Sequence, residues 1–272
     1  MGSAGGLVAP IRAVEVKPLE RTAVELAGLR VVQIDPDQLV RQLASARRSA
    51  PGPYLVGYLN AHVFNSCWRY TEVYQLLRRA DLVYADGASI GWAARLTGQG
   101  RMARSTSADW LEPVLAALVE RGKSLFLVGG APGMVESYVS VASERYPSLR
   151  SGICGTMHGF FSPDEDESLM HTIAASGADI LVVGMGTPWQ EQFVLRNLAR
   201  LPVQAVWWIG AGMEYATGNQ SRGPAWTRAM GHEWLGRLIS DPRRLAGRYL
   251  LGNPLFLWRV LTRSRPAVAG EP

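Results

Sequence analysis

The feature that most constrains the fold is a regular alternation of short apolar segments with longer stretches of helical spacing. The apolar segments 54–60, 80–85, 124–128 and 179–183 predict strands, and each precedes a stretch whose apolar residues recur at helical intervals. Strands that are apolar throughout are typical of a parallel sheet with both faces covered. The pattern therefore predicts an α/β fold: a Rossmann-like, mostly parallel sheet with helices on both faces.

The same pattern divides the 272 residues into four regions. Residues 1–25 are predicted to form a flexible leader, 26–218 a Rossmann-like catalytic domain, 219–265 a helical appendage and 266–272 a loose tail. A weak strand is expected over 149–155, and short helices of the appendage are expected around 227–240, at 242–251 and from about 254. The leader lacks the basic start and long apolar run of a secretory signal. No apolar segment approaches the roughly 18 residues that a membrane-spanning helix needs.

The appendage is strongly basic, whereas the whole chain carries a net charge of only +5. Its acidic residues are Glu233 and Asp241, and tryptophans are interleaved with its basic ones. Nine arginines lie in it: Arg222, Arg228, Arg237, Arg243, Arg244, Arg248, Arg259, Arg263 and Arg265. Such a face is typical of proteins that bind an anionic membrane surface or a pyrophosphate. Nucleic-acid binding proteins share this composition, and a solvated basic face is the plain alternative. We expect an anionic membrane surface and no nucleic acid as partner.

Ligands of parallel α/β sheets bind beyond the carboxyl ends of the strands, so the residues that follow each predicted strand are the site candidates. Three glycine-rich turns lie there, and glycine lets backbone N–H groups approach a phosphate. A tight turn without a ligand fits each of them equally well. The candidate phosphate contacts in these turns are Gly129, Gly130, Gly186 and Gly210.

Polar side chains also follow the predicted strands. Asp86 ends an apolar strand, where a carboxylate suits general-base work or caps the next helix, and the residues alone leave both roles open. Asn60 ends the segment 54–60. Gln190 and Glu214 follow two of the glycine-rich turns, where they are placed to hydrogen-bond a diphosphate or a ribose; exposure to solvent is the alternative.

Two common phosphate-binding motifs are absent. Gly184 and Gly186 open a dinucleotide fingerprint, but Trp189 stands where the third glycine is required. Lys17 and Lys123 are the only lysines, and neither lies in a Walker motif. An NAD-dependent reaction and a P-loop reaction are therefore not expected.

No catalytic metal and no cofactor are expected. Two D-x-D patterns, at 35–37 and 164–166, match the metal-binding motif of some glycosyltransferases. Both begin predicted helices, where acidic side chains cap backbone N–H groups and favour the helix dipole. Cys67 and Cys154 lie far apart, which predicts neither a disulfide framework nor a zinc site.

Many short motifs, in this order, resemble the WecG/TagA/CpsF glycosyltransferases of bacteria from about residue 28 to 262. The motifs are LNAH (59–62), ADLV (80–83), DG (86–87), RST (104–106) followed by Asp109, FLVGG (126–130), HGFF (158–161), GMGTPWQE (184–191), GHEWL (231–235), DPRRL (241–245) and GNP (252–254). The resemblance implies a Rossmann-like domain with a C-terminal appendage.

The resemblance also implies an activity: inverting, metal-independent transfer of a hexose or N-acetylhexosamine from a UDP-sugar. The donors of the family are UDP-N-acetylmannosamine, its uronic acid or UDP-glucose, and the acceptors are sugars on undecaprenyl diphosphate. We therefore expect a cytoplasmic protein, peripheral on the inner face of the cell membrane. Which donor, acceptor and polysaccharide pathway apply is open, and so is assembly into a homo-oligomer.

Residue by residue, Asp86 resembles the general base of the family, and Asn60 and Gln190 resemble contacts to the donor sugar and diphosphate. Phe160 matches an aromatic residue near uracil, and Glu214 an acid that contacts the nucleoside. The remaining substrate-binding candidates are Thr106, in the RST motif, and the appendage arginines Arg237, Arg244 and Arg248.

The chain departs from the family pattern at two positions. Tyr58 stands where many relatives have threonine, which affects the choice of donor or acceptor. Gly247 replaces one arginine of a pair, and Arg248 is expected to substitute for it.

Two other functions fit parts of the sequence. One is a different nucleotide-sugar enzyme, such as an NAD-dependent epimerase or dehydrogenase, against which the incomplete dinucleotide fingerprint argues. The other is a non-catalytic protein that binds a membrane surface through its basic appendage, which leaves the polar residues at the strand ends unexplained.

Overall fold

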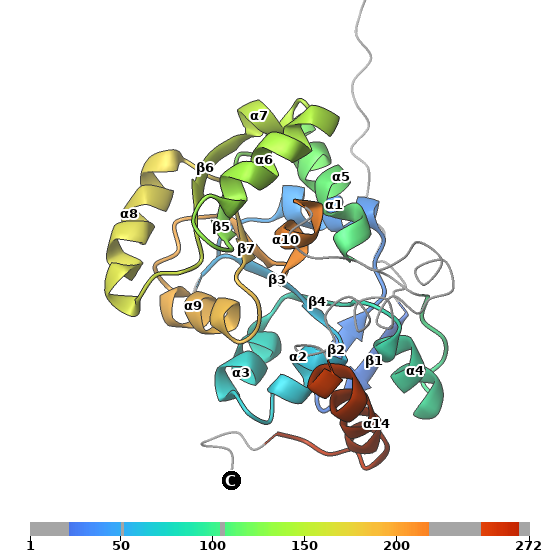
Figure 1. Cartoon of the computed structure of the whole chain (residues 1–272). Coiled ribbons are helices and arrows are strands. Elements are labelled where there is room, and N and C mark those ends of the chain that lie inside the picture. Colours follow the sequence, from blue (N-terminus) through green and yellow to red (C-terminus); the bar gives the residue numbers. More distant parts are fainter. Residues whose placement is uncertain (1–21, 50–51, 104–106, 218–245, 267–272) are drawn as a thin grey trace, which may run out of the picture.

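The computed structural model describes residues 22–49, 52–103, 107–217 and 246–266 (Figure 1). Within them the strands form one eight-stranded sheet in the order β1-β2-β4-β3-β8-β7-β5-β6. Every pair of neighbouring strands is parallel except the hairpin of β1 and β2. The strands are β1 (Ala23–Leu26), β2 (Leu29–Val32), β3 (Tyr54–Leu59), β4 (Leu82–Ala85), β5 (Leu125–Gly129), β6 (Ile153–Met157), β7 (Ile180–Gly184) and β8 (Ala205–Trp208).

Helices cover both faces of the sheet, as Figure 1 shows. On one face α1, α5 and α10 pack together, with α6 against α10; on the other, α3 packs against α9. The helices are α1 (Pro36–Ser45), α2 (Ala61–Ser66), α3 (Thr71–Arg79), α4 (Ser89–Leu96), α5 (Ser107–Glu120), α6 (Met134–Arg145), α7 (Leu149–Gly152), α8 (Asp166–Ser176), α9 (Trp189–Asn197), α10 (Gly212–Ala216) and α14 (Gly252–Leu261), with a 3-10 turn η1 (Pro163–Glu165) and a π-helical turn η2 (Gly247–Leu251). The predicted mostly parallel α/β fold is confirmed.

The central strands are buried along their whole length, which explains their continuous apolar sequence. All residues of β5, β7 and β8 are buried. Trp207 of β8 stacks on Trp110 of α5 with ring centroids 6.2 Å apart, so one pair of aromatic rings joins the sheet to the helical layer above it.

Two details of the predicted layout differ from the structure. The leader was expected to run to residue 25, but β1 begins at Ala23 and pairs with β2 through a tight hairpin. A weak strand was expected over 149–155, but Leu149–Gly152 forms a helical turn and the strand begins at Ile153. Both segments are too short for their apolar spacing to settle the type of element.

Capping was the favoured role for the acids at 35–37, and the structure confirms it for Asp35. Its carboxylate accepts a hydrogen bond from the Gln38 backbone N–H at 2.7 Å, and the Gln38 side chain accepts one from the Asp35 N–H at 3.2 Å. This reciprocal pair is a capping box. The Asp35 side chain therefore serves as the N-cap of α1.

Part of the predicted appendage lies within the described residues. The helix expected from about residue 254 is present as α14, which packs against α2 and α4. Phe256 of α14 meets Phe64 of α2 edge-on, with ring centroids 5.1 Å apart. Residues 218–245, with the helix expected around 227–240 and most of a second one at 242–251, lie outside the described part of the chain.

Candidate active site

The candidate site lies where the parallel strands end, because their carboxyl ends share one edge of the sheet. β3 and β4 are neighbours, and their last residues, Leu59 and Ala85, are in register. Asn60 and Asp86 follow them directly. The topology thus places these two predicted site residues side by side, although they are 26 positions apart in the chain.

Asn60 and Asp86 are joined by a hydrogen bond. The Asn60 Nδ2 donates to Asp86 Oδ2 at 3.2 Å. The other end of the Asn60 amide caps α2, where Oδ1 accepts from the N–H groups of His62 and Val63, both at 3.1 Å. Because the helix fixes Oδ1, the NH₂ group is oriented toward Asp86.

The second oxygen of Asp86 is also held. Oδ1 accepts from the Ser107 backbone N–H at 3.0 Å and from its hydroxyl at 3.1 Å, at the start of α5. The next helix in the chain, α4, has Ala88 at its N-cap and no side-chain cap, so of the two roles left open for Asp86 the capping of that helix is not found. Asp86 is half-buried, and both of its oxygens are oriented by protein donors. Such a fixed carboxylate is suited to accept a proton from a bound hydroxyl.

Tyr84, two residues before Asp86, lies beneath the site and is fully buried. Burial, and then the negative charge of Asp86, raise the pKa of its hydroxyl well above the usual range. The Tyr84 hydroxyl accepts a hydrogen bond from Trp207 Nε1 at 3.2 Å. Tyr84 therefore stays neutral and supports the strand end that carries Asp86.

The three glycine-rich turns meet at the same edge, on β5, β7 and β8. A Cβ atom on Gly129 would collide with the Gly184 carbonyl oxygen, so glycine is needed there for packing between neighbouring strands. Gly210 has a φ of 62° and lies against the Tyr58 hydroxyl. Gly130 and Gly186 also have positive φ, 61° and 76°. The phosphate contacts of these four glycines stay predictions.

Gln190 lies beneath the turns and is fully buried. Its Oε1 accepts from the Gly210 N–H at 2.9 Å, and its Nε2 donates to Glu191 Oε1 at 2.9 Å. In this arrangement Gln190 ties the turn after β7 to the turn after β8. Its contact with a donor sugar stays a prediction.

Glu191 is a residue of the site that the sequence analysis did not select. It is fully buried, and its Oε1 also accepts from the Thr187 hydroxyl at 2.9 Å, while Oε2 has no hydrogen-bond partner. Burial raises its pKa to about 7. The sequence shows only an acid in the first turn of a helix, which is the usual place for an exposed one.

The other candidates are placed as follows. Phe160 follows β6 and is 72% exposed, and its backbone N–H donates to His158 Nδ1 at 3.3 Å. Glu214 is half-buried in α10. Arg248 belongs to η2, but the position of its side chain is not described, and Thr106, Arg237 and Arg244 lie outside the described residues.

In the second D-x-D pattern, Glu165 takes part in the capping box of η1, and Asp166 is used in a buried contact. Asp166 is almost fully buried and accepts hydrogen bonds from Arg196 Nη2 and Asn197 Nδ2, both at 2.8 Å. Burial opposes its ionisation, but these bonds and the arginine charges hold its pKa below the usual value. In the described parts of the chain, no three His, Cys, Asp or Glu side chains are grouped as a metal site requires.

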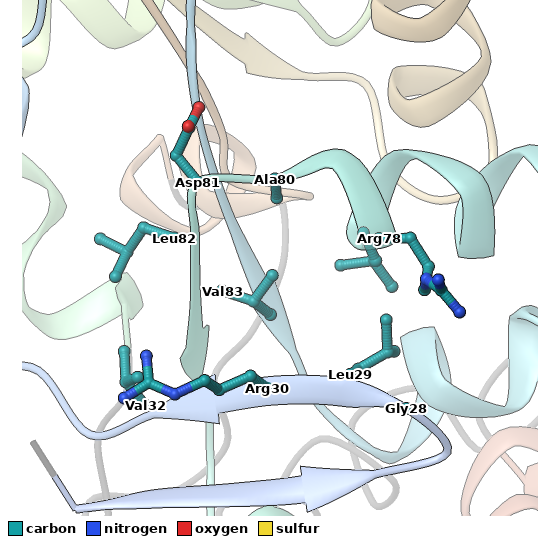
Figure 2. Close-up of a pocket in the computed structure, with 10 residues that line it drawn as sticks. Gly28, Leu29, Arg30, Val32, Arg78, Ala80, Asp81, Leu82 and Val83 are labelled. Carbon is teal, nitrogen blue, oxygen red and sulfur yellow. The ribbon is translucent and has the colours of Figure 1, made fainter.

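A cavity of about 230 Å³ lies at the opposite edge, where β2 and β4 begin. Figure 2 shows that Arg30, Arg78 and Asp81, which line it, point in different directions around an apolar centre. The Asp81 Oδ2 accepts the Leu55 N–H at 2.7 Å. The charged groups do not converge there, so this cavity does not compete with the edge that carries Asp86.

The model of the WecG/TagA/CpsF glycosyl transferase family matches residues 24–268, which is nearly the whole chain. The chain belongs to this family. As a WecG/TagA/CpsF protein it is a glycosyltransferase, an activity that requires a nucleotide-sugar donor and a sugar acceptor. In the part of the chain that the structure describes, no helix has the length and apolar character to span a bilayer.

Proposed function

We propose that this WecG/TagA/CpsF protein is an inverting, metal-independent transferase that moves a hexose or N-acetylhexosamine from UDP to a sugar on undecaprenyl diphosphate. Donors of the UDP-N-acetylmannosamine, UDP-N-acetylmannosaminuronic acid or UDP-glucose type are expected. The observation that carries the proposal is the Asp86 carboxylate, held from two sides at the end of β4.

The proposed reaction is a single displacement at the anomeric carbon. The acceptor hydroxyl oxygen attacks this carbon while its proton passes to the Asp86 carboxylate. The bond between the anomeric carbon and the UDP oxygen breaks, UDP leaves, and the configuration inverts. Asn60 and Ser107 keep Asp86 in one orientation, which favours attack because the reacting groups are held in place beforehand.

Negative charge grows on the leaving diphosphate and needs donors that are already in place. We assign this role to backbone N–H groups of the turns that follow β5 and β7, at Gly129 and Gly186, joined by appendage arginines. The Gly210 N–H itself donates to Gln190, so Gly210 contributes by holding the neighbouring turn in place. The hydrogen bond between Gln190 and Gly210 supports this role, because it fixes the turn after β7 relative to the turn after β8. Arg237, Arg244 and Arg248 are the arginines expected to close over the site.

The outer face of α14 supports a place on a membrane surface. Leu255, Trp258 and Leu261 of α14 are 39%, 58% and 60% exposed, and Leu251, at the end of η2 just before the helix, is 73% exposed. The spacing of the three α14 residues puts them on one side of the helix. Large apolar side chains beside basic ones are typical of helices that lie in a membrane interface. We therefore place the protein at the inner face of the cell membrane, where undecaprenyl-linked sugars are presented.

The test is release of UDP from a panel of UDP-sugars, with and without a lipid diphosphate sugar in detergent. One donor should release UDP only with acceptor, and Asp86→Asn should lower the rate about 100- to 10,000-fold, the usual contribution of a general base. Asp37→Asn, in an exposed turn of α1, is the matched control and should keep the wild-type rate.

Two results would contradict the proposal. Full activity of a folded Asp86→Asn protein would show that Asp86 is not the general base. Release of UDP that requires a divalent metal and stops with a chelator would show a metal-dependent transferase.

A further inference from the structure

A second cavity, of about 440 Å³, lies between α14, the turn that joins β1 to β2, and the chain that follows α4. Three arginines line it, Arg259, Arg263 and Arg265, and Glu25 is the acidic residue of the lining. Positive charge is therefore in excess around an open space. Like charges that share a cavity repel one another, and an anion between them removes this repulsion.

The part of this cavity that the β1–β2 turn forms is far from the candidate active site, whereas Phe64, on its other side, lies in α2 four residues after Asn60. The cavity wall includes Gly28, four residues before Val32, and Val32 pairs with Tyr84, two residues before Asp86. At the usual rise per residue of a strand, the two levels are about 20 Å apart along the sheet. The arginines face the side of the cavity that lies at the amino-terminal edge of the sheet, because Arg263 and Arg265 follow α14 next to the β1–β2 turn.

The backbone is strained at two points of the cavity wall. Arg263 has a φ of 51° and Ala27 a φ of 53°, and among the described residues these are the non-glycine residues with positive φ. Arg263 ends α14 in a Schellman arrangement, in which Ser264 N–H bonds to the Arg259 carbonyl at 3.0 Å and Arg263 N–H to the Val260 carbonyl at 3.2 Å. Glycine is the preferred residue at this position, so arginine is held there at an energetic cost.

Arg259 is held in place by other contacts. Its Nη1 donates to the Asn65 side-chain oxygen at 2.9 Å and to the Asn65 carbonyl at 3.2 Å. The guanidinium carbon lies 4.1 Å from the centre of the Trp68 ring. Partial burial lowers its pKa from the usual value, but an arginine stays charged at any physiological pH. A fixed positive charge is thus a permanent part of the cavity wall.

The neutral polar groups of the wall are already used. Gln99 bonds to the backbone of Glu25 through both ends of its amide, at 2.8 and 3.1 Å, and the Thr97 hydroxyl donates to the Ala93 carbonyl at 2.8 Å. These contacts shape the wall and hold the β1–β2 hairpin against the end of α4. The arginines are therefore the polar groups of the wall that decide which kind of ligand the cavity binds.

We propose that this cavity binds a phosphate group through Arg263, Arg259 and Arg265. Guanidinium groups match phosphate oxygens in charge and in geometry. The exposed apolar face of α14 belongs to the helix that supplies Arg259 and ends shortly before Arg263, so the phosphate of a lipid headgroup is the source that we expect. The site is separate from the transferase site, and the proposal does not depend on the identity of donor or acceptor.

Arg263→Gly is the decisive variant. Glycine removes the charge and is the residue that the left-handed backbone prefers, so the full-length protein should melt at the same or a higher temperature. Arg263→Lys keeps the charge without the planar guanidinium. Arg150→Ala removes an exposed arginine at another place on the surface and is the matched control.

Two measurements are made on each protein. One is the shift of the melting temperature with inorganic phosphate at constant ionic strength, and the other is binding to vesicles of phosphatidylglycerol compared with phosphatidylcholine. We expect Arg263→Gly to weaken binding to phosphatidylglycerol about tenfold, the size of one lost charge-assisted hydrogen bond. Arg263→Lys should lie between that variant and the wild type, and Arg150→Ala should match the wild type.

The source of the phosphate group follows from which measurement responds. A loss on vesicles alone identifies a lipid headgroup, and a loss with inorganic phosphate as well identifies a site for free phosphates. Equal behaviour of Arg263→Gly and Arg150→Ala in both measurements would overturn the proposal. Because Arg263 is remote from Asp86, loss of phosphate binding with unchanged UDP release in detergent separates this site from the transferase site.

Discussion

At the scale of single residues, Glu191 makes the stability of the protein depend on pH. Its pKa rises from 4.5 to about 7 on folding because the carboxyl is buried. Between these two values the folded chain keeps a proton that the unfolded chain has lost, so the free energy of unfolding falls as pH rises. This pKa shift corresponds to a loss on the order of 3 kcal/mol in the free energy of unfolding. Cys67, at the end of α2, is close enough to Glu191 for their charges to interact. Burial raises the pKa of its thiol, so Cys67 stays neutral and does not add to this pH dependence.

Glu191→Gln should remove this dependence, because an amide fits the same place and carries no charge. Urea unfolding at pH 5 and at pH 8 should show a large loss of wild-type stability at the higher pH and a small one in the variant. Glu120→Gln, at the exposed end of α5, is the control and should follow the wild type. Equal losses in wild type and Glu191→Gln would show that Glu191 ionises normally.

Asn60 has two tasks that a substitution can separate. Serine still caps a helix but is too short to reach Asp86, to which Asn60 donates at 3.2 Å. Asn60→Ser should therefore unfold within about 0.5 kcal/mol of the wild type and transfer sugar at about a tenth of its rate, by the value of one hydrogen bond to a charged group. Asn60→Ala should lose both the cap of α2 and the hydrogen bond to Asp86, so both its stability and its transfer rate should fall. Wild-type transfer by Asn60→Ser would show that Asn60 serves only as a cap.

The sequence predicted that Asn60 and Asp86 lie at the ligand-binding edge, because both follow strands of one parallel sheet and parallel strands end at the same edge. It did not predict that β3 and β4 are neighbours or that the two side chains form a hydrogen bond. Ser107 and Glu191 were not predicted. Whether a serine or a glutamate at a helix start turns inward depends on packing between elements, which neighbouring residues along the chain do not encode. The same limit explains why the sequence could not show that Gln190, predicted to contact the donor, is fully buried beneath the turns.

At the scale of elements, the turns at the strand ends depend on close packing of backbones. Gly129→Ala places a methyl group against the Gly184 carbonyl oxygen, so β5 and β7 must separate, and the loss of stability should be about 2–3 kcal/mol. Gly87→Ala is the matched control, since it has a φ of 77° and open space around it and should cost about 1 kcal/mol. Denaturant unfolding of both variants measures the difference, and equal losses would contradict the close approach of β5 and β7.

Element type could be predicted where a segment was long or fully buried, as for β7 and α5. The short elements could not be predicted from local sequence. Helix α2 is six residues long and is held at its start by the Asn60 cap, and α7 is a single turn between α6 and β6. In such segments tertiary contacts decide the conformation, because isolated helices of this length are unstable.

At the scale of the whole molecule, the arrangement separates two surfaces. The carboxyl edge of the sheet carries Asp86, and α14 lies beside α2 and α4 (Figure 1) with Leu255, Trp258 and Leu261 exposed. Helix α2 begins at Asn60 and packs against α14. A single short helix therefore connects the proposed catalytic carboxylate to the proposed membrane face, so binding at a membrane fixes the distance and orientation of the site relative to the lipid.

The apolar face of α14 predicts that membrane binding and catalysis can be separated. Leu255→Asp with Trp258→Asp places two charges on side chains that are 39% and 58% exposed, so the fold should tolerate them while insertion into an interface becomes unfavourable. Sedimentation with vesicles, including zwitterionic ones, should fall at least tenfold, because each large apolar side chain contributes about 1.5–3 kcal/mol when buried. UDP release with acceptor in detergent should stay near the wild-type rate.

Ser168→Asp with Thr172→Asp adds the same charge to the exposed face of α8 and should leave sedimentation unchanged. Equal sedimentation of the two double variants would mean that α14 does not contact the lipid, and the basic residues of 218–245 would then be the next segment to test.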